Sequence, residues 1–546
     1  MVLLIGMSKL NPSILGLIQQ YQNLTAVSQP AAGAVTISVD EVASRVAAFY
    51  EKIRTVVDWQ EEHLMRRIEI ERILKRRLFL KLNAEEKEGL AENFVRELIR
   101  GGYFPNNQIP KSKIQDVKRL IDKYTFILEQ APRPRGKTQS EFYSELIAIA
   151  ACETEEILDT AFHQKIRILI EFMENVMREK IKIGKIALSK TNLTGEEKNT
   201  LIFIAVSQAL FKLDQAMINY NLLKRQFPNW FNLSSEESQN IAENIHSIFD
   251  NFKKYFSHPL FNKFYQLCEK YDTPYLLIGD IIPENSINIE ELMSDEKELE
   301  RAIKKTYNKR LAALKRKTAR SAFYATVSIF LSKMLILYIL EDVFLARLTG
   351  KIYLLAAILD VAIPTLLMLF LSSTIRLPSS ENFRLIMSEI KKIVYESDKK
   401  DVYEIEFYPK RPFIVNAVVG LFYFLGICIS LGAIAWCFYK LKYPPLSCFI
   451  LLVFISLISF AGVRIRQRAR ELHITEDRET LFNFIFDPYA LPIIYLGRWI
   501  MRRWRKINLV AVFFNLLLDA PILVFVEFLE HWRYFLKEKK EEIHNN

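Results

Sequence analysis

The chain has 546 residues, of which 50% are hydrophobic, while only 16 are Gly and 19 are Pro. This length allows two to four domains, and the composition favours helices over sheets. The 74 Lys and Arg residues outnumber the 63 Asp and Glu residues and give a net charge of +11. Much of this excess lies beside apolar segments, so contact with anionic lipids is expected and nucleic-acid binding is not.

The first part of the chain predicts a cytoplasmic helical-bundle domain over residues 38–300, preceded by a flexible N-terminal tail over 1–37. Ser38 and Glu41 form a capping box that opens a first long helix. Further helices are predicted by their apolar periodicity at 85–100, 112–130, 139–187, 195–226, 235–270 and from 289 onward. Capping boxes at Thr194–Glu197 and Ser234–Glu237 open two of them. The segment 273–285 is the only one in this domain that could be extended. The pattern is typical of an antiparallel all-α bundle.

Two groups of residues in this domain have spacings that can place metal ligands on one side of a helix. Cys152, Glu156, Asp159 and His163 are spaced by 4, 3 and 4 residues, which would place them on one face of a single helix. On a later helix, Glu243 and His246 have the Glu-x-x-His spacing of carboxylate-bridged di-metal bundles. A second such pair and two further inward carboxylates are missing from the pattern. We therefore expect no metal and no other cofactor, and we regard these residues as weak candidates only.

Residues 301–320 contain no acidic residue and form a basic juxtamembrane helix, after which the first apolar segment begins. Residues 321–375 predict a first transmembrane hairpin, because about 20 apolar residues suffice to cross a hydrocarbon core. A small cytoplasmic insert follows at 376–411, with a strand candidate at 402–408. A second transmembrane hairpin is predicted at 412–463.

The last part of the chain combines basic, aromatic and apolar residues. Residues 464–506 predict a basic cytoplasmic or interfacial region, since cations and tryptophans surround Arg498 to Lys506. Residues 507–546 predict a re-entrant or fifth transmembrane segment followed by a charged C-terminal helix. Asp519 and Pro521 lie in the middle of this apolar segment, which favours the bent alternative over a straight crossing. The fold class is therefore all-α, with a helical domain followed by a multi-pass membrane domain of four to five spans.

The basic residues also predict orientation, because they concentrate at 1–320, 376–411 and 464–506 and are retained on the cytoplasmic side. The N-terminus lacks a signal peptide and is poor in Arg for a transit peptide, so we expect a bacterial inner-membrane protein with a cytoplasmic N-terminus. Residues expected to contact anionic lipids are Lys315, Arg316, Lys317, Arg320, Arg464, Arg466, Arg502, Arg503 and Arg505.

Three ionisable residues lie near the middle of apolar segments, namely Lys333, Asp360 and Asp519. The short loop of the first hairpin makes its two helices neighbours, so Lys333 and Asp360 are expected to pair. No catalytic motif occurs. The leading hypothesis is a membrane-anchored interaction or assembly module with a protein partner for its helical domain. One alternative is a channel or secondary transporter that uses these three intramembrane charges; four spans are few for a transporter unless it forms a homo-oligomer. The second alternative is a lipid-modifying enzyme acting at 481–506.

Overall fold

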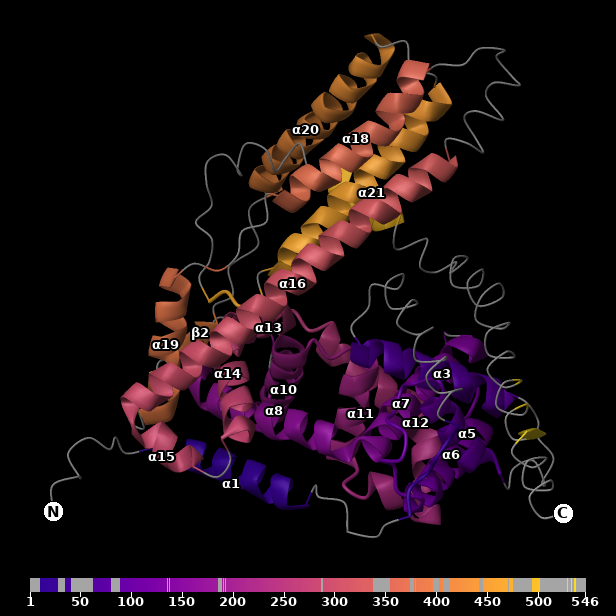
Figure 1. Ribbon diagram of the computed structural model, residues 1–546, viewed down its shortest axis with the longest axis vertical. Helices are drawn as coiled ribbons and strands as arrows, with labels where there is room; N and C mark the ends of the chain where they lie inside the picture. Colours follow the sequence, from indigo (N-terminus) through magenta and orange to yellow (C-terminus); the bar gives the residue numbers. More distant parts are fainter. Residues whose placement is uncertain are drawn as a thin grey trace. The chain divides into compact units, whose positions relative to one another are not determined.

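The computed structural model describes residues 10–27, 35–40, 62–79, 89–134, 136, 138–184, 189, 191, 193–285, 288–336, 354–373, 378, 380–395, 402–405, 413–440, 445–469, 471–474, 493–500, 528, 532 and 535–536. These residues are predominantly helical, and the all-α prediction is confirmed at this level. The chain divides into two compact units (Figure 1). The first comprises Met1–Leu299, Ile390–Glu406 and Phe514–Asn546, and the second comprises Glu300–Glu389 and Phe407–Phe513.

The first unit is a helical bundle around α7. Its helices are α1 (Pro12–Val27), α3 (Glu62–Phe79), α5 (Leu90–Arg100), α6 (Ser112–Gln130), α7 (Gln139–Leu158), α8 (Thr160–Lys180), α10 (Gly195–Phe211), α11 (Gln215–Gln226), η1 (Trp230–Asn232), α12 (Ser235–Phe256), α13 (Phe261–Lys270), α14 (Asp272–Glu284) and α15 (Ile289–Ser294). Helix α7 packs against α3, α6 and α11, while α10 packs against α8 and α13. The middle of α7 is therefore enclosed on several sides.

Several helix ends agree with the sequence signals. Thr194 and Ser234 accept hydrogen bonds from the backbone N–H groups of Glu197 and Glu237, and both capping boxes are complete. Helix α6 has the predicted bounds, and α5 ends before Gly101 as expected. The capping box predicted at Ser38 depends on Glu41, which lies outside the described residues.

The three longest predicted helices of this unit are each divided in two. Asp159 ends α7 and its side chain caps α8 by accepting a hydrogen bond from the Phe162 N–H group. Lys212 adopts a left-handed conformation, with φ 50°, and ends α10 before Asp214 caps α11. The break between α12 and α13 contains Pro259, which disfavours helical geometry in the preceding residue. After each break, the second helix packs against α7 or α10.

Two other expectations about this unit are wrong. Residues Pro12–Val27, expected in a flexible tail, form helix α1, because Ile14, Leu17 and Ile18 are buried along one side of it. The segment 273–285, expected as the one extended stretch, is helix α14. Gly279 allows α14 to approach α8 closely, since a Cβ atom there would lie 2.8 Å from Leu169.

The only sheet among the described residues is a parallel pair of short strands, β1 (Ile181–Ile183) and β2 (Tyr403–Ile405). Ile181 is opposite Tyr403 and Ile183 is opposite Ile405. The strand predicted at 402–408 is therefore present over its described residues. Nearby, Val394 accepts a backbone hydrogen bond from Asn11 at 2.8 Å, and the Tyr395 hydroxyl donates to the Met293 carbonyl at 2.8 Å. Residues 390–405 thus belong to the first unit despite their distance along the chain.

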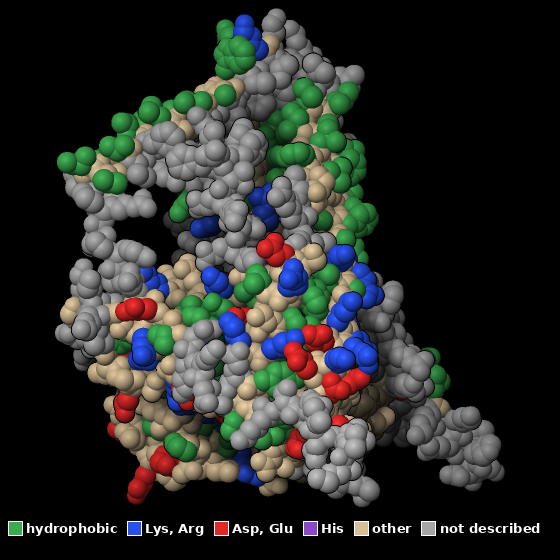
Figure 2. All heavy atoms as spheres, turned by 90° about the vertical axis from the view of Figure 1, so that its left-hand side faces the viewer, with side chains coloured by type: hydrophobic (Ala, Val, Ile, Leu, Met, Phe, Trp, Pro, Cys, Tyr) green, Lys and Arg blue, Asp and Glu red, His purple; other side chains and the backbone are tan. Residues whose placement is uncertain are grey.

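The remaining helices are α16 (Glu296–Ile336), α18 (Leu354–Ser373), α19 (Ser380–Tyr395), α20 (Phe413–Lys440) and α21 (Pro445–Ala469). Helix α16 continues from the basic run into the first apolar segment without interruption. In the second unit, Ala325, Met368, Ile458 and Ile465 form a buried apolar cluster that joins α16, α18 and α21. Large apolar side chains elsewhere on these helices are exposed, as the upper part of Figure 2 shows, and they include Phe323, Leu366, Ile414 and Phe449.

By length and apolar composition, one helix among the described residues, Ser447–Gln467, is able to cross a bilayer, and a shorter apolar helix covers Ile358–Ser373. A buried helix of a soluble protein can satisfy the same criterion. This helix alone does not support the predicted four to five spans.

Candidate functional site

The middle of α7 carries three buried carboxylates, Glu153, Glu155 and Glu156. Glu153 and Glu156 are three residues apart and lie on one face of the helix, whereas Glu155 points in another direction. Burial of a carboxylate is costly unless a cation or a hydrogen-bond donor compensates for the lost hydration. The site is therefore described by the cations and hydrogen-bond donors that contact these three carboxylates.

Glu153 is the most fully bonded of the three. Its carboxylate accepts hydrogen bonds from Lys123 Nζ at 2.6 Å, from the Tyr124 hydroxyl at 2.8 Å and from Trp230 Nε1 at 2.8 Å. Lys123 also donates to the Trp230 carbonyl at 2.8 Å and lies 4.7 Å from the centre of the Trp230 ring. Glu153 thereby fixes η1 against α6 and α7.

Glu156 accepts two hydrogen bonds from Lys224 Nζ, at 2.6 and 2.7 Å. Burial acts to raise the pKa of Glu156, but the charge and hydrogen bonds of Lys224 outweigh it and lower this pKa. Lys224 itself lies 5.2 Å from the ring centre of Tyr220 and 5.0 Å from that of Phe231. This pair thus holds Phe231, whose ring is partly exposed, beside α7.

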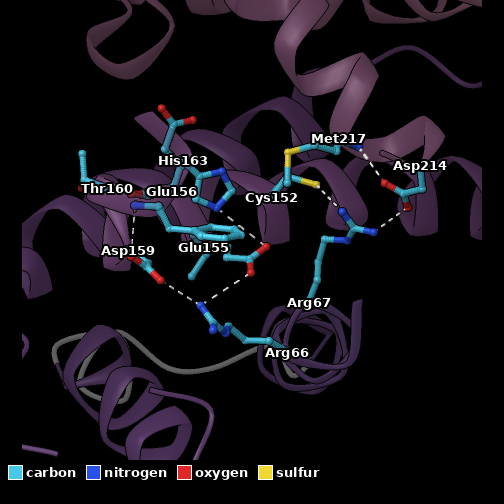
Figure 3. A network of polar contacts seen from close by, with 12 residues as sticks. Arg66, Arg67, Cys152, Glu155, Glu156, Asp159, Thr160, His163, Asp214 and Met217 are labelled. Atoms are coloured by element: carbon cyan, nitrogen blue, oxygen red, sulfur yellow. Dashed lines mark hydrogen bonds and ion pairs between the residues drawn. The ribbon is translucent and has the colours of Figure 1, made fainter. Parts of the chain in front are cut away.

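Glu155 faces a looser network (Figure 3). Arg66 lies 3.8 Å from Glu155 and 3.1 Å from Asp159, and His163 Nε2 lies 3.9 Å from Glu155 Oε2. Burial raises the pKa of Glu155 to about 7, although Arg66 and Arg67 oppose this, and burial lowers the pKa of His163 to about 4. Near neutral pH, His163 is therefore uncharged.

Arg67 completes the network on its other side, as Figure 3 also shows. Its guanidinium group lies 2.7 Å from Asp214 and 3.8 Å from the Cys152 sulfur. Burial raises the pKa of the Cys152 thiol despite the nearby Arg67, so this sulfur is a packing group and not a nucleophile. Asp214 also caps α11, so Arg67 ties α3 to the start of that helix.

A cavity of about 300 Å³ opens beside the Glu153 and Glu156 pairs. Helix α6 contributes Lys113, Asp116 and Arg119 to its wall. Helix α8 contributes Thr160, Gln164 and Arg167, and the η1 segment contributes Phe231 and Asn232. The floor is formed by the two carboxylates with Ile157, and Leu120 adds apolar surface.

The wall of this cavity is held together by two polar contacts between elements. Arg119 Nη1 donates to Asn232 Oδ1 at 3.1 Å, and Lys113 Nζ donates to Thr160 Oγ1 at 3.4 Å. The geometry can accommodate a small polar ligand, because roughly 300 Å³ is at the lower end of the volumes of ligand pockets.

In the second unit, Lys333 Nζ lies 3.6 Å from Asp360 Oδ1, and both side chains are completely buried. This is the pairing that the sequence predicts. Lys333 Nζ also lies 5.4 Å from the ring centre of Phe454 on α21. The pair thus links three helices, and its charges compensate one another away from solvent.

The weak metal candidates are occupied by other contacts. Glu156 and Asp159 pair with Lys224 and Arg66, and Asp159 stands at a helix break, so the single-helix face expected for Cys152 to His163 does not form. Glu243 accepts a hydrogen bond from Gln239, and the His246 ring nitrogen contacts the Pro132 carbonyl oxygen at 2.7 Å. In the described part of the chain, no group of three or more His, Cys, Asp or Glu side chains is placed to hold a metal ion.

The predicted lipid-contact residues divide into two groups. Those on α16 and α21 are exposed, namely Lys315, Arg316, Lys317, Arg320, Arg464 and Arg466. Arg502, Arg503, Arg505 and Asp519 lie outside the described residues. The predicted lipid contacts of Arg502, Arg503 and Arg505 and the predicted intramembrane position of Asp519 therefore stay predictions.

Sequence reasoning missed the partners of the α7 carboxylates, chiefly Lys123, Lys224 and Trp230. A usable signal was present in the segment Cys152-Glu-Thr-Glu-Glu156, which follows Ile147-Ala-Ile-Ala-Ala151 without a break in the helix. Three carboxylates on adjacent faces of an otherwise apolar helix predict several buried cations on neighbouring helices. Comparison with protein-family models, with curated proteins and with solved structures finds no match for this chain.

Proposed function

We propose that this chain is a multi-pass membrane protein whose large helical domain acts as a cytoplasmic interaction module. The observation that carries the proposal is the side-chain distribution on α16, α18, α20 and α21. Large apolar residues such as Phe323, Leu366 and Ile414 are 63%, 62% and 74% exposed, whereas the charged Lys333 and Asp360 are fully buried against each other. Apolar residues outside and charges inside are the arrangement that a lipid environment favours.

The contacts of residues 382–405 support two returning hairpins. Val394 and Tyr395 bond to Asn11 and to Met293 of α15, and β2 pairs with β1, all in the first unit. These contacts support a return of the chain to the same side of a membrane between residues 300 and 390. An even number of crossings satisfies this requirement, which fits one hairpin made by the end of α16 and by α18.

A second contact supports the second hairpin in the same way. The Asn382 amide donates to the Leu472 carbonyl at 2.7 Å, and its oxygen accepts from the Ile474 N–H group at 2.9 Å. These groups are buried, so residues 382 and 472–474 belong on one side. Helices α20 and α21 then supply another even number of crossings, which gives the four-span arrangement.

Cell fractionation tests membrane insertion. The full chain is expected to remain in the membrane fraction after washes with alkaline carbonate and with concentrated salt, and to be released by detergent. Release by either wash would contradict insertion, because only peripheral proteins detach without disruption of the bilayer.

Cysteine labelling tests orientation. An impermeant maleimide added outside the cell is expected to label Tyr443→Cys above the wild-type background and not to label Ser380→Cys, since the basic residues around 380 are retained in the cytoplasm. The opposite pattern would reverse the proposed orientation. The bacterial inner membrane is the proposed location, and anionic lipids are the proposed partners of the exposed basic residues on α16 and α21.

The transporter alternative depends on the same buried pair and on Asp519, which lies outside the described residues. Lys333 and Asp360 are enclosed by α16, α18 and the Phe454 ring, which favours a structural link over a hydrated pathway. The lipid-enzyme alternative depends on residues 481–506, of which only 493–500 are described. No observation on the described residues favours that alternative.

A further inference from the structure

We infer that the cavity between α6, α8 and η1 binds a small phosphomonoester that carries a compact apolar or aromatic body. This inference is independent of membrane insertion, because every residue that lines the cavity belongs to the first unit.

The two carboxylates of the floor are already neutralised. Glu153 has Lys123 at 2.6 Å, and Glu156 has Lys224 at 2.6 Å. A ligand therefore meets two compensated ion pairs and not two free negative charges. These pairs also make the floor rigid, since both lysines are anchored by aromatic rings of the surrounding elements.

The wall of the cavity carries an excess of positive charge. Lys113, Arg119 and Arg167 line it together with a single wall carboxylate, Asp116. Asp116 lies 3.9 Å from Lys113 and 3.3 Å from Arg119, so it compensates for only part of their charge. Arg167 is about half exposed and has Glu171, 3.8 Å away on its own helix, as its ion-pair partner. Such a wall attracts an anion.

A phosphate group suits this wall better than a neutral polar group. Guanidinium groups bind phosphate oxygens through two parallel hydrogen bonds, and a phosphomonoester carries nearly two negative charges at neutral pH. Two arginines and one lysine from α6 and α8 can share those charges. Gln164 and Asn232 add side-chain amides, which donate further hydrogen bonds to phosphate oxygens.

The remainder of the cavity is apolar. Ile157 on α7, Leu120 on α6 and the partly exposed ring of Phe231 lie among the lining residues. Phe231 is held beside Lys224, so it offers a fixed aromatic surface to the ligand. Inorganic phosphate would leave this surface in contact with water, whereas an organic ester would cover it. The volume of about 300 Å³ limits the body of the ester to a small one.

The test measures binding to the detergent-solubilised full chain by isothermal titration calorimetry, with phenyl phosphate, inorganic phosphate and benzylammonium as separate probes. Phenyl phosphate is expected to bind at one site and about tenfold more tightly than inorganic phosphate, because its ring covers apolar surface. Benzylammonium is expected not to bind. Equal affinity for the two phosphates, binding of benzylammonium, or no saturable binding of phenyl phosphate would each overturn the inference.

Variants of the wall locate the site. Arg167→Gln and Arg119→Gln are each expected to weaken phenyl phosphate binding by about tenfold, the usual value of a charge-assisted hydrogen bond. Their matched controls are Lys165→Gln and Lys118→Gln, which remove the same charge from exposed positions on α8 and α6 outside the cavity lining. Equal losses in the controls would show a general charge effect and would overturn the assignment to this cavity.

A gain of affinity provides an independent check, since a misfolded variant cannot produce it. Asp116→Asn removes the one carboxylate of the wall and frees Lys113 and Arg119 from it. This variant is expected to bind phenyl phosphate several-fold more tightly than the wild type does. Unchanged or weaker binding by a folded Asp116→Asn protein would contradict the role given to the wall cations.

Discussion

Glu155 and His163 face each other in the interior of the first unit and have pKa values shifted in opposite directions. The pKa of Glu155 is raised from 4.5 to about 7, so the folded protein gains stability as the pH falls from about 7 to 4.5. The pKa of His163 is lowered from 6.5 to about 4, so the folded protein loses stability as the pH falls from about 6.5 to 4. Over the shared range the two effects oppose each other.

Replacement of either residue is expected to expose the effect of the other. The melting temperature of Glu155→Gln minus that of the wild type should become more negative as the pH falls from 7 to 5. The same difference for His163→Gln should become more positive as the pH falls from 6.5 to 4.5. Each pKa differs by about 2.5 from its ordinary value, which corresponds to roughly 3 to 4 kcal/mol at most. Thermal unfolding of the full chain in detergent measures both. A constant difference from the wild type across this range would contradict the assigned titrations.

The Glu153 pair gives a second prediction at the residue scale. Glu153→Gln leaves Lys123 buried with reduced compensation, and loss of one partner of a buried pair typically costs about 3 to 5 kcal/mol. Adding Lys123→Met removes the buried charge and is expected to recover part of the melting temperature. A double variant less stable than Glu153→Gln alone would show that packing, and not charge compensation, dominates at this position.

At the scale of the element, helix starts were easier to predict than helix breaks. The capping boxes at Thr194 and Ser234 are local signals, so the sequence alone located them. At Lys212 the helix ends on a left-handed residue that is not glycine, and at Asp159 it ends within a periodic apolar pattern. The positions of these breaks depend on the packing of α8 and α11 against other helices, which the periodicity of one segment does not reveal. The same limit applies to the candidate site, because the cations that neutralise α7 come from helices far away in the sequence.

Replacing glycines by alanine tests how closely segments of the second unit approach one another. A Cβ atom at Gly497 would lie 2.0 Å from the Ser456 carbonyl oxygen, whereas one at Gly462 would lie 2.8 Å from the flexible end of Leu371. Gly497→Ala is therefore expected to destabilise the protein more than Gly462→Ala, by about 1 to 3 kcal/mol, the cost of overpacking. Gly420→Ala on α20 is the control, since nothing lies within 4 Å of its added Cβ. Thermal unfolding in detergent ranks the three, and equal effects would contradict the close approach at residue 497.

At the scale of the whole molecule, either lipid or water covers the outer surface of the apolar helices α16, α18, α20 and α21. A charge placed on that surface distinguishes the two solvents. Leu366 on α18 is 62% exposed and lies well within an apolar helix. In water, Leu366→Lys would leave stability nearly unchanged, because surface substitutions usually change it by about 0.5 kcal/mol or less. In a bilayer, a lysine near the centre of a span costs about 2.5 to 3.5 kcal/mol on insertion scales.

We therefore expect Leu366→Lys to reduce the amount of membrane-integrated protein strongly, as measured by the carbonate-resistant fraction. The matched control is Leu385→Lys on α19, where an apolar residue is also exposed but lies in a polar, amphipathic helix outside the proposed spans. This control should integrate as the wild type does. If both variants integrate equally, the exposed apolar surface of α18 is not in contact with lipid, which would contradict the proposed membrane spans. Neither substitution replaces Lys333 or Asp360. The experiment therefore tests which solvent surrounds the helices and does not test the ion pair between them.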